Sequence, residues 1–195
     1  MIKHSEACER NKNPILNILK DVFSDRKHIL EIGSGTGQHA VYFGKNLRHL
    51  TWQPSDLNEN ISDISERWQL EGTENVKSPI EIDVTKQPWP VRDIDAVFTA
   101  NTFHIMPWEC ASYFFKGVGK VLTKNGLLCI YGPFKYKGKF TTESNADFDK
   151  WLQNSDPKSG IRNFEDVNSL ALKQGLELVC DHNMPANNQC IIWKR

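Results

Sequence analysis

Two patterns of apolar residues alternate along most of this chain. Short apolar runs occur at 28–32, 50–55, 80–84, 94–100 and 127–131, and each has the length of a buried strand. Between them lie segments in which apolar residues return every three or four positions, as on one face of a helix. The alternation predicts an α/β fold with a largely parallel sheet covered by helices on both faces.

The expected helices also follow from residues that favour helix starts and ends. Asn13 is a good N-cap and Pro14 suits the first helical position, so a helix is expected to begin there and to run to about Phe23. Pro107 is expected to open another helix that runs to about Leu122. Further helices are expected at 38–47, around 61–68 and at 163–174, the last closed by Gly175.

Three segments interrupt this pattern. Pro54 is expected to mark the end of the strand at 50–55 or an irregularity in it. The pair Asn125–Gly126 predicts a turn that leads into the strand at 127–131. The stretch 132–144 is expected to be the one long irregular segment, and segments of that length are usually functional or disordered.

The C-terminal part follows a different rule. Apolar runs at 176–180 and 190–193 are separated only by the region around 184–188, which leaves no room for a crossover helix. The two runs should therefore form an antiparallel hairpin at the sheet edge. No repeat, low-complexity segment or linker divides the chain, so residues 1–195 are expected to form a single domain.

Charge and cysteine usage narrow the function classes. Lys plus Arg and Asp plus Glu each number 24, so no overall basic charge is present to hold a polyanion, and no nucleic-acid partner is expected. The first residues lack the apolar core of a secretory signal, and no run reaches the ~18 apolar residues of a membrane span. The five cysteines form no C-x-x-C pair. We therefore expect reduced thiols, no metal site, no membrane partner and a cytoplasmic location.

Three glycines, Gly33, Gly35 and Gly37, lie between an expected strand and an expected helix. Glycine lets a ligand approach the backbone, and a helix N-terminus supplies free N–H donors. Three interpretations apply, namely a plain turn, a nicotinamide dinucleotide site and an S-adenosylmethionine site. The dinucleotide fingerprint G-x-G-x-x-G requires a third glycine where this chain has Gln38.

Acidic residues at three strand ends favour the last interpretation. Glu31, two positions before Gly33, would repel a pyrophosphate but not a ligand with ammonium and sulfonium groups. Asp56 follows the next strand, where a carboxylate can accept both ribose hydroxyl protons. Asp83, near the end of the third strand, can meet an adenine amino group.

The segment 31–37 with these acids resembles motif I and the downstream acids of class I S-adenosylmethionine-dependent methyltransferases, over about 29–195. That resemblance implies a Rossmann-like sheet of seven strands, mostly parallel, with a C-terminal antiparallel hairpin. A closer resemblance covers nearly the whole chain. It is to the family catalogued as domain of unknown function 938, which includes methyltransferase-like protein 26, and it rests on the segments 9–16, 30–40, 52–56, 100–106, 131–134, 138–145 and 184–188.

The resemblance implies S-adenosyl-L-methionine as the cofactor and a set of residues that would bind it. Arg10 and Asn11 are included only because such N-terminal segments often close this pocket. The expected cofactor-binding residues are Arg10, Asn11, Glu31, Gly33, Ser34, Gly35, Thr36, Gly37, Asp56, Leu57, Asp83, Val84 and Asn101.

His104 and Tyr131 are the candidate catalytic residues. His104 is either a base near neutral pH or a hydrogen-bonded structural histidine. Tyr131 either faces the cleft or packs at its strand end, and Asn101 either contacts the cofactor or orients an acceptor. The sequence Asn-Thr-Phe-His at 101–104 differs from the Asn/Asp-Pro-Pro-Tyr motif of amino-methylating enzymes, so an exocyclic or amide nitrogen acceptor is not favoured.

Two further features have alternative interpretations. Basic and aromatic residues alternate at 134–140, which fits either a lid over a substrate or a solvated loop. Trp151 and Trp193 are expected to pack in the core or at an edge.

The leading hypothesis is a methyltransferase that acts on an unidentified small-molecule acceptor. The alternatives are a protein methyltransferase, a cofactor-binding module without turnover and, more distantly, a nicotinamide oxidoreductase. The sequence indicates no oligomeric state.

Overall fold

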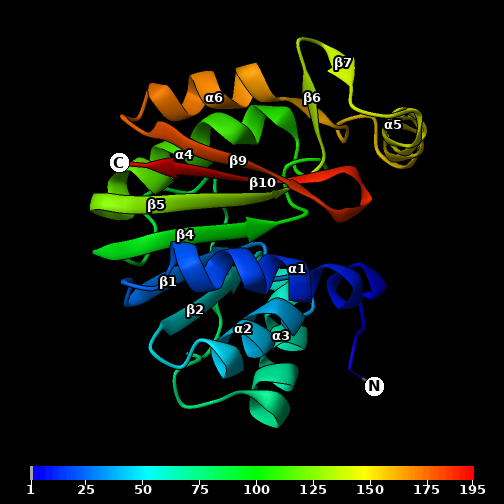
Figure 1. The fold of residues 1–195 in the computed structure, drawn as a ribbon. Coiled ribbons are helices and arrows are strands. Elements are labelled where there is room, and N and C mark those ends of the chain that lie inside the picture. Colours follow the sequence, from blue (N-terminus) through cyan, green and yellow to red (C-terminus); the bar gives the residue numbers. More distant parts are fainter. Residues whose placement is uncertain (1) are drawn as a thin grey trace.

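The computed structural model describes residues 2–195 and contains a seven-stranded sheet with helices on both faces (Figure 1). The sheet has the order β3-β2-β1-β4-β5-β10-β9. Its strands are β1 (His28–Ile32), β2 (Thr51–Asp56), β3 (Ile80–Glu81), β4 (Ile94–Ala100), β5 (Leu122–Gly132), β9 (Glu177–Met184) and β10 (Asn188–Lys194). The helices are α1 (Glu6–Val22), α2 (Gln38–Asn46), α3 (Asn58–Glu71), α4 (Trp108–Val121), α5 (Glu143–Ser155), α6 (Phe164–Leu172) and the short η1 (Pro185–Asn187).

The predicted architecture is confirmed. Strands β3, β2, β1, β4 and β5 pair in parallel. Strand β10 pairs antiparallel with both β5 and β9, so the C-terminal hairpin closes one side of the sheet. The expected elements at 28–32 and 94–100 match β1 and β4 at both ends.

The alternating strand residues divide the core into two layers. Ile29, Ala96 and Cys129 face α1 and α2 on one side of the sheet, where Phe43 and Trp52 are fully buried. Their neighbours along the strands face α4 and α6 on the other side. Trp193 belongs to this second layer and is fully buried, as predicted.

Helix α1 begins eight residues before the predicted start, since its first residue is Glu6 and Pro14 lies inside it. The Ser5 hydroxyl accepts a hydrogen bond from the N–H of Cys8, and the Ser5 N–H donates to Gln38 Oε1 at 2.6 Å. Ser5, like Asn13, is a residue type preferred at N-caps, and the contact with Gln38 of α2 favours Ser5 as the start of the helix. Pro14 leaves one helical carbonyl without its partner, but the turns before it are fastened to α2.

The second and third strands differ from prediction in detail. Pro54 lies within β2, opposite Glu31 of β1. The irregularity lies at the opposite edge of β2, where this strand faces residues 76–81. There the pairing is interrupted between the Trp52–Val76 bridge and the Ser55–Ile80 pair. Strand β3 ends at Glu81 instead of residue 84. Asp83 Oδ1 accepts from the N–H and hydroxyl of Thr85, and this local turn competes with strand pairing.

Strand β5 starts at Leu122, before the predicted turn. Asn125 has a left-handed φ of 65°, and the pairing of β4 with β5 shifts register between Ile94 and Ala96. The pair Asn125–Gly126 therefore forms a bulge within β5 instead of a turn before it.

The stretch 132–144 is not irregular. It forms a hairpin of β6 (Phe134–Tyr136) and β7 (Lys139–Phe140), which joins β8 (Arg162–Asn163) in a second sheet. Lys137 and Gly138, with φ of 51° and 74°, make the two-residue turn. Trp151 on the following α5 is 62% exposed, so the expectation that it packs in the core or at an edge is wrong.

Candidate functional site

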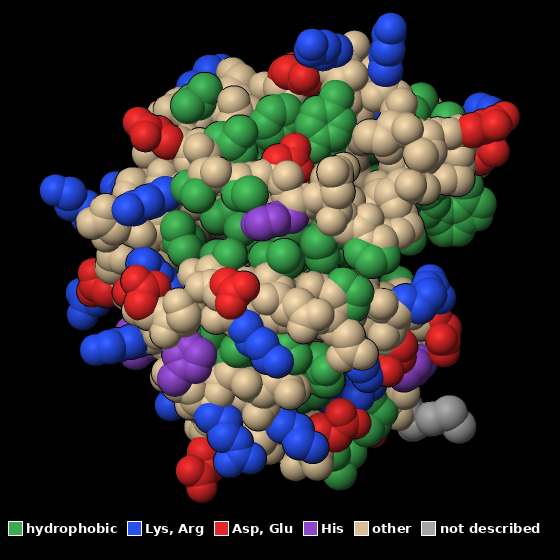
Figure 2. Space-filling view, viewed as in Figure 1, with side chains coloured by type: hydrophobic (Ala, Val, Ile, Leu, Met, Phe, Trp, Pro, Cys, Tyr) green, Lys and Arg blue, Asp and Glu red, His purple; other side chains and the backbone are tan. Residues whose placement is uncertain are grey.

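One large cavity lies at the carboxyl ends of the parallel strands, where ligands bind in open α/β sheets. Its volume is about 1330 Å³, which exceeds the ~300–1,000 Å³ typical of a single small-ligand pocket. Figure 2 shows the surface hollowed at this end of the molecule. We call the part lined by residues 32–36 and the ends of β2 and β3 the glycine side. The part lined by the ends of β4 and β5, the start of α5 and the β9–β10 turn is the roof side.

The predicted site residues are largely brought together here. All of them line the cavity except Glu31 and Gly37. Gly37 lies behind the turn at the N-cap of α2, with φ of 74°.

The glycine turn approaches two other segments closely. The N–H groups of Gly33 and Ser34 both donate to Ser55 O at 3.0 Å. A Cβ at Gly33 would lie 2.7 Å from Thr102 Oγ1, so only glycine fits there. At Gly35, with φ of 57°, a Cβ would meet nothing within 4 Å. The backbone at Gly35 is therefore open to the cavity.

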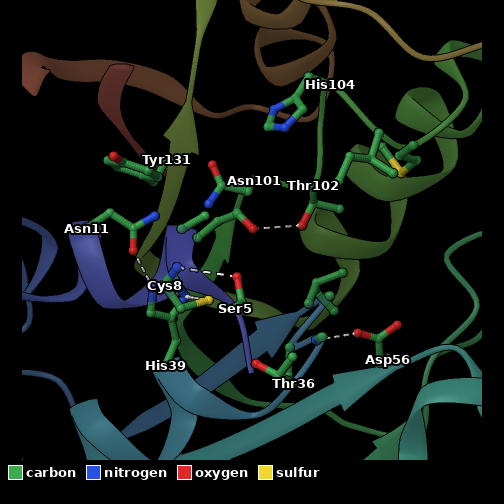
Figure 3. Close-up of a pocket in the computed structure, with 18 of the residues that line it drawn as sticks. Ser5, Cys8, Asn11, Thr36, His39, Asp56, Asn101, Thr102, His104 and Tyr131 are labelled. Atoms are coloured by element: carbon green, nitrogen blue, oxygen red, sulfur yellow. Dashed lines mark hydrogen bonds between the residues drawn. The ribbon is translucent and has the colours of Figure 1, made fainter. Parts of the chain in front are cut away.

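Asp56 is held rigidly at the end of β2. Its Oδ2 accepts from the N–H of Gly35 at 2.7 Å, and its Oδ1 accepts from the N–H of Leu57 and from Asn60 Nδ2. Figure 3 shows the carboxylate beside the glycine turn. Because each carboxylate oxygen has two lone pairs, Oδ2 retains one acceptor position.

Glu31 of β1 lies behind the glycine turn, where its side chain is buried on the same side of the sheet as Trp52 of the neighbouring strand β2. Trp52 Nε1 donates to Glu31 Oε2 at 2.9 Å. Burial raises the pKa of this carboxyl to about 7, and the Asp56 charge acts in the same direction. Glu31 therefore supports the turn from below and does not line the cavity wall.

Asp83 lines the cavity just beyond β3, together with Val84. The Thr85 hydroxyl and N–H hold the pKa of this carboxyl below its usual value, and Lys86 lies 3.7 Å away. At neutral pH the glycine side thus presents a fixed negative charge near its outer end.

The first turns of α1 form another wall of the cavity. Gln38 Nε2 donates to Glu9 Oε1 at 2.9 Å. Asn11 Oδ1 lies 2.7 Å from His39 Nε2, and burial lowers the pKa of His39 to about 4, so the neutral ring donates to Asn11. These contacts fasten α1 to α2 and place Arg10 and Asn11 at the cavity.

The end of β4 brings Asn101 and His104 to the roof side. Asn101 has a left-handed φ of 57°, and its N–H donates to Tyr131 O at 2.9 Å. Figure 3 shows Asn101 between Tyr131 and His104. Burial, with a smaller contribution from the Arg162 charge, lowers the pKa of His104 to about 4. Burial raises the pKa of Tyr131 to about 12, so both side chains are neutral at pH 7.

The family described as "Protein of unknown function (DUF938)" matches residues 2–195. The chain belongs to this family. This confirms the resemblance seen in the sequence.

Two further kinds of similarity concern methyltransferases. The DUF938 chain is 32% identical over 82 residues to a fatty-acid O-methyltransferase of Mycolicibacterium smegmatis. The matched residues make up 42% of this chain and 28% of that protein. The DUF938 chain superimposes on an O-methyltransferase family protein from Burkholderia thailandensis with a TM-score of 0.83 and 15% identity, covering 97% of this chain and 57% of that one. The chain also superimposes on human N-acetylserotonin methyltransferase in complex with SAM, with a TM-score of 0.81 and 15% identity. This superposition covers 97% of this chain and 53% of the human protein chain.

These similarities establish that the DUF938 chain has the fold of class I methyltransferases. The chain spans little more than half of the length of these solved structures and about a quarter of the fatty-acid enzyme.

Several residues of the roof side were missed in the sequence. Asn145 and Phe148 of α5 and Ala186 of the β9–β10 turn all line the cavity, as does Thr102 after β4. Thr142 caps α5 by accepting from Asn145 N, and a threonine followed by an acidic residue is a recognisable helix start. The segments 138–145 and 184–188 also carried the family resemblance, although no role could be assigned to them.

The basic and aromatic residues at 134–140 do not line the cavity. Phe134 is buried, and Tyr136 stacks on Phe164 with ring centres 5.3 Å apart. Within residues 2–195 no group of three His, Cys, Asp or Glu side chains could hold a metal ion. No helix in the same range is both long and apolar enough to cross a membrane.

Proposed function

We propose that this DUF938 chain is an S-adenosylmethionine-dependent methyltransferase that acts on a small-molecule acceptor. The observation that carries the proposal is the convergence of the glycine turn, Asp56 and Asp83 on one wall of a cavity in a methyltransferase fold. Two of the relatives named above are named as methyltransferases of fatty acids and of N-acetylserotonin, and the second is described in complex with SAM. These descriptions support the class of reaction and a small acceptor.

The glycine side fits the cofactor in shape and in donors and acceptors. The backbone is open at Gly35, so a ligand can lie against residues 33–36. Asp56 Oδ2 keeps one acceptor position for a ribose hydroxyl, and Asp83 with Val84 would border the adenine. Arg10, Asn11, Ser34, Thr36, Leu57 and Asn101 complete the proposed contacts, while Glu31 and Gly37 act by shaping the turn.

The cofactor supplies a methyl group on a sulfonium, whose leaving group is already activated. The protein therefore has to position an acceptor, exclude water and, where the acceptor is protic, remove its proton. Neutral His104 is the proposed base, and Tyr131 would orient the acceptor.

Calorimetric titration with S-adenosylmethionine tests the proposal. Wild-type protein should bind, and Asp56→Ala should weaken binding about 100-fold, since hydrogen bonds to a carboxylate are worth roughly 1.5–3 kcal/mol each. Asp166→Ala removes an exposed carboxylate of α6 and should leave binding unchanged. Absence of binding by folded wild-type protein would contradict the proposal.

Two further properties are proposed with this function, and a labelling experiment tests the class of acceptor. Residues 1–195 form a single domain, because both core layers share one sheet. The location is cytoplasmic, which the five free cysteines support. Tritium from labelled cofactor should appear in small molecules; label in a protein band from a lysate would favour the protein-methyltransferase alternative.

A further inference from the structure

The buried part of the roof side lacks ionised side chains. His104 and Tyr131 are 5% and 3% exposed and are neutral at pH 7. Arg10 and Asp156 also line the cavity, but both are exposed. A charged acceptor group would lose its hydration here without meeting an oppositely charged side chain.

Arg162 does not line the cavity, and its guanidinium is held by backbone carbonyls, so it is not placed to pair with an acceptor. Its Nε donates to Phe103 O at 2.9 Å, and its Nη2 donates to Met106 O and Lys158 O at 2.7 Å. These three backbone carbonyls hold the guanidinium in place.

Two polar side chains of the roof side face the cavity without a partner. Within residues 2–195 no hydrogen bond is made by the ring of His104 or by the side-chain amide of Asn101, and Figure 3 draws none. His104 is buried and Asn101 is half-buried, and both line the cavity, so a bound ligand can supply the hydrogen bonds that the protein does not. A hydroxyl group would satisfy both residues, since it can donate to the imidazole nitrogen and accept from the amide.

An apolar surface continues from this point to the outside of the molecule. The ring of Phe148 meets His104 edge-on, with centres 5.4 Å apart, and Trp151 stacks on Phe148 at 5.9 Å. Trp151 and Ile105 are 62% and 57% exposed. Figure 2 shows hydrophobic side chains on the α5 margin of the hollow. Exposed apolar surface that adjoins a cavity is typical of a binding site.

Helix α5 is held firmly enough to serve as one wall. Asn145 Nδ2 donates to Asn187 O at 3.0 Å, and Asn187 Nδ2 donates to Ser144 Oγ at 3.1 Å. On the next turn, Asp149 Oδ1 accepts from Ile161 N at 2.6 Å. Phe148 lies between these anchors, so its ring is preorganised for contact with a ligand.

We infer that the roof side binds a neutral, largely apolar acceptor that carries a hydroxyl group, with its apolar part against Phe148 and Trp151. The inference rests on the proposed methyltransferase function. When the reaction occurs, the hydroxyl oxygen forms a bond to the methyl carbon, the carbon–sulfur bond breaks with its electron pair on sulfur, and the hydroxyl proton passes to His104. The products are a methyl ether and S-adenosylhomocysteine.

A panel of simple acceptors tests the class. Label transfer from tritiated S-adenosylmethionine is measured for 2-naphthol, 1-decanol, decanoate and decylamine. At least one of the two neutral hydroxyl compounds should have a kcat/KM about tenfold or more above both ions, because no buried side chain of the roof side compensates the charge of either ion. The better of 2-naphthol and 1-decanol then shows whether the apolar part is aromatic or alkyl.

Matched phenylalanine variants test the wall. Phe148→Ala should raise the KM of the preferred acceptor about tenfold, and weaken its calorimetric binding to the S-adenosylhomocysteine complex equally, with unchanged cofactor affinity. Phe140→Ala, on the β6–β7 hairpin outside the cavity, should change neither quantity. His104→Gln should lower kcat about 100-fold or more, remove the acid limb of the pH profile and leave KM unchanged.

The outcomes separate this inference from the proposed function. Failure to bind S-adenosylmethionine overturns the proposed function. If the protein binds the cofactor, three results would each overturn only the inference about the roof side. They are a preference for decanoate or decylamine, no reaction of either hydroxyl compound, and equal effects of the two phenylalanine variants.

Discussion

The two sides of the cavity differ in the charge and the hydrogen bonding of their polar side chains. On the glycine side the polar groups are charged and are already hydrogen-bonded to the backbone, as Asp56 is by Gly35 and Leu57. On the roof side the side chains of His104 and Asn101 are neutral and have no hydrogen-bond partner among residues 2–195. The first arrangement is preorganised for a ligand of fixed charge distribution, and the second selects for neutral ligands that complete its hydrogen bonds.

The buried ionisable groups of the two sides should affect stability in opposite directions as pH changes. Glu31, with a folded pKa raised to about 7, stays neutral while the unfolded chain ionises near 4.5, so its contribution to stability is lost as pH rises through this window. His104, with a folded pKa lowered to about 4, stays neutral while the unfolded chain protonates near 6.5. Its contribution is lost as pH falls through that window.

Urea unfolding of wild type, Glu31→Gln and His104→Gln at several pH values measures this contrast. The stability of wild type relative to Glu31→Gln should fall by about 3 kcal/mol between pH 4.5 and 7. The stability of wild type relative to His104→Gln should rise by about 3 kcal/mol between pH 4 and 6.5. Parallel curves for all three proteins would show that the two groups are not buried as described.

The close approach of the two sides gives the next largest expected effect. Gly33→Ala should lower the free energy of unfolding by about 2–3 kcal/mol, because the new Cβ strains a left-handed backbone and contacts Thr102 Oγ1. Gly35→Ala has the same backbone strain but no contact within 4 Å, so the loss should be only about 1 kcal/mol. The methyl group of Gly35→Ala projects into open space beside the cavity. Gly35→Ala should therefore weaken cofactor binding although its loss of stability is small.

Thermal and urea unfolding with cofactor titration separate these two glycines. Equal losses of stability would mean that Thr102 moves aside. In that case Thr102 does not fix the distance between the two sides.

How much the sequence predicts also differs between the sides. The glycine side was predictable because Gly33, Asp56 and Asp83 each follow a strand, and parallel strands bring their carboxyl ends to one edge. Glu31 was identified, but its sequence position does not reveal that the carboxylate meets Trp52 behind the turn. That contact depends on strand register, which periodicity leaves open.

The roof side was predictable only in part. His104 and Tyr131 were identified from strand ends, whereas Asn145 and Phe148 belong to a helix in a region expected to follow an irregular loop. The hydrogen bond between Asn145 and Asn187 joins residues that are 42 positions apart in the sequence. Such contacts arise from packing and have no local signal.

The fastening of α5 to the β9–β10 turn should contribute moderately to stability. Asn145→Ala should lower the free energy of unfolding by about 1–2 kcal/mol, because it leaves the carbonyl of Asn187 without its donor. The control Asn46→Ala removes an exposed hydrogen bond to Tyr42 O and should cost at most about 0.5 kcal/mol. Urea unfolding measures both. If the two losses are equal, the roof side is not held by this contact.

The smallest effect is expected at the strained turn of the roof side. Ala186 has φ of 56°, a conformation that disfavours every side chain and that glycine adopts freely. Ala186→Gly should therefore raise the free energy of unfolding by about 0.5–1 kcal/mol, the relief of strain being partly offset by a more flexible unfolded chain. Lys137→Gly relieves a similar strain, with φ of 51°, in the β6–β7 turn outside the cavity. Both variants should gain stability in urea unfolding, but only Ala186→Gly should alter the KM of the acceptor. Identical kinetics in the two variants would mean that the strain at Ala186 serves the hairpin alone and has no role in shaping the wall against which the acceptor binds.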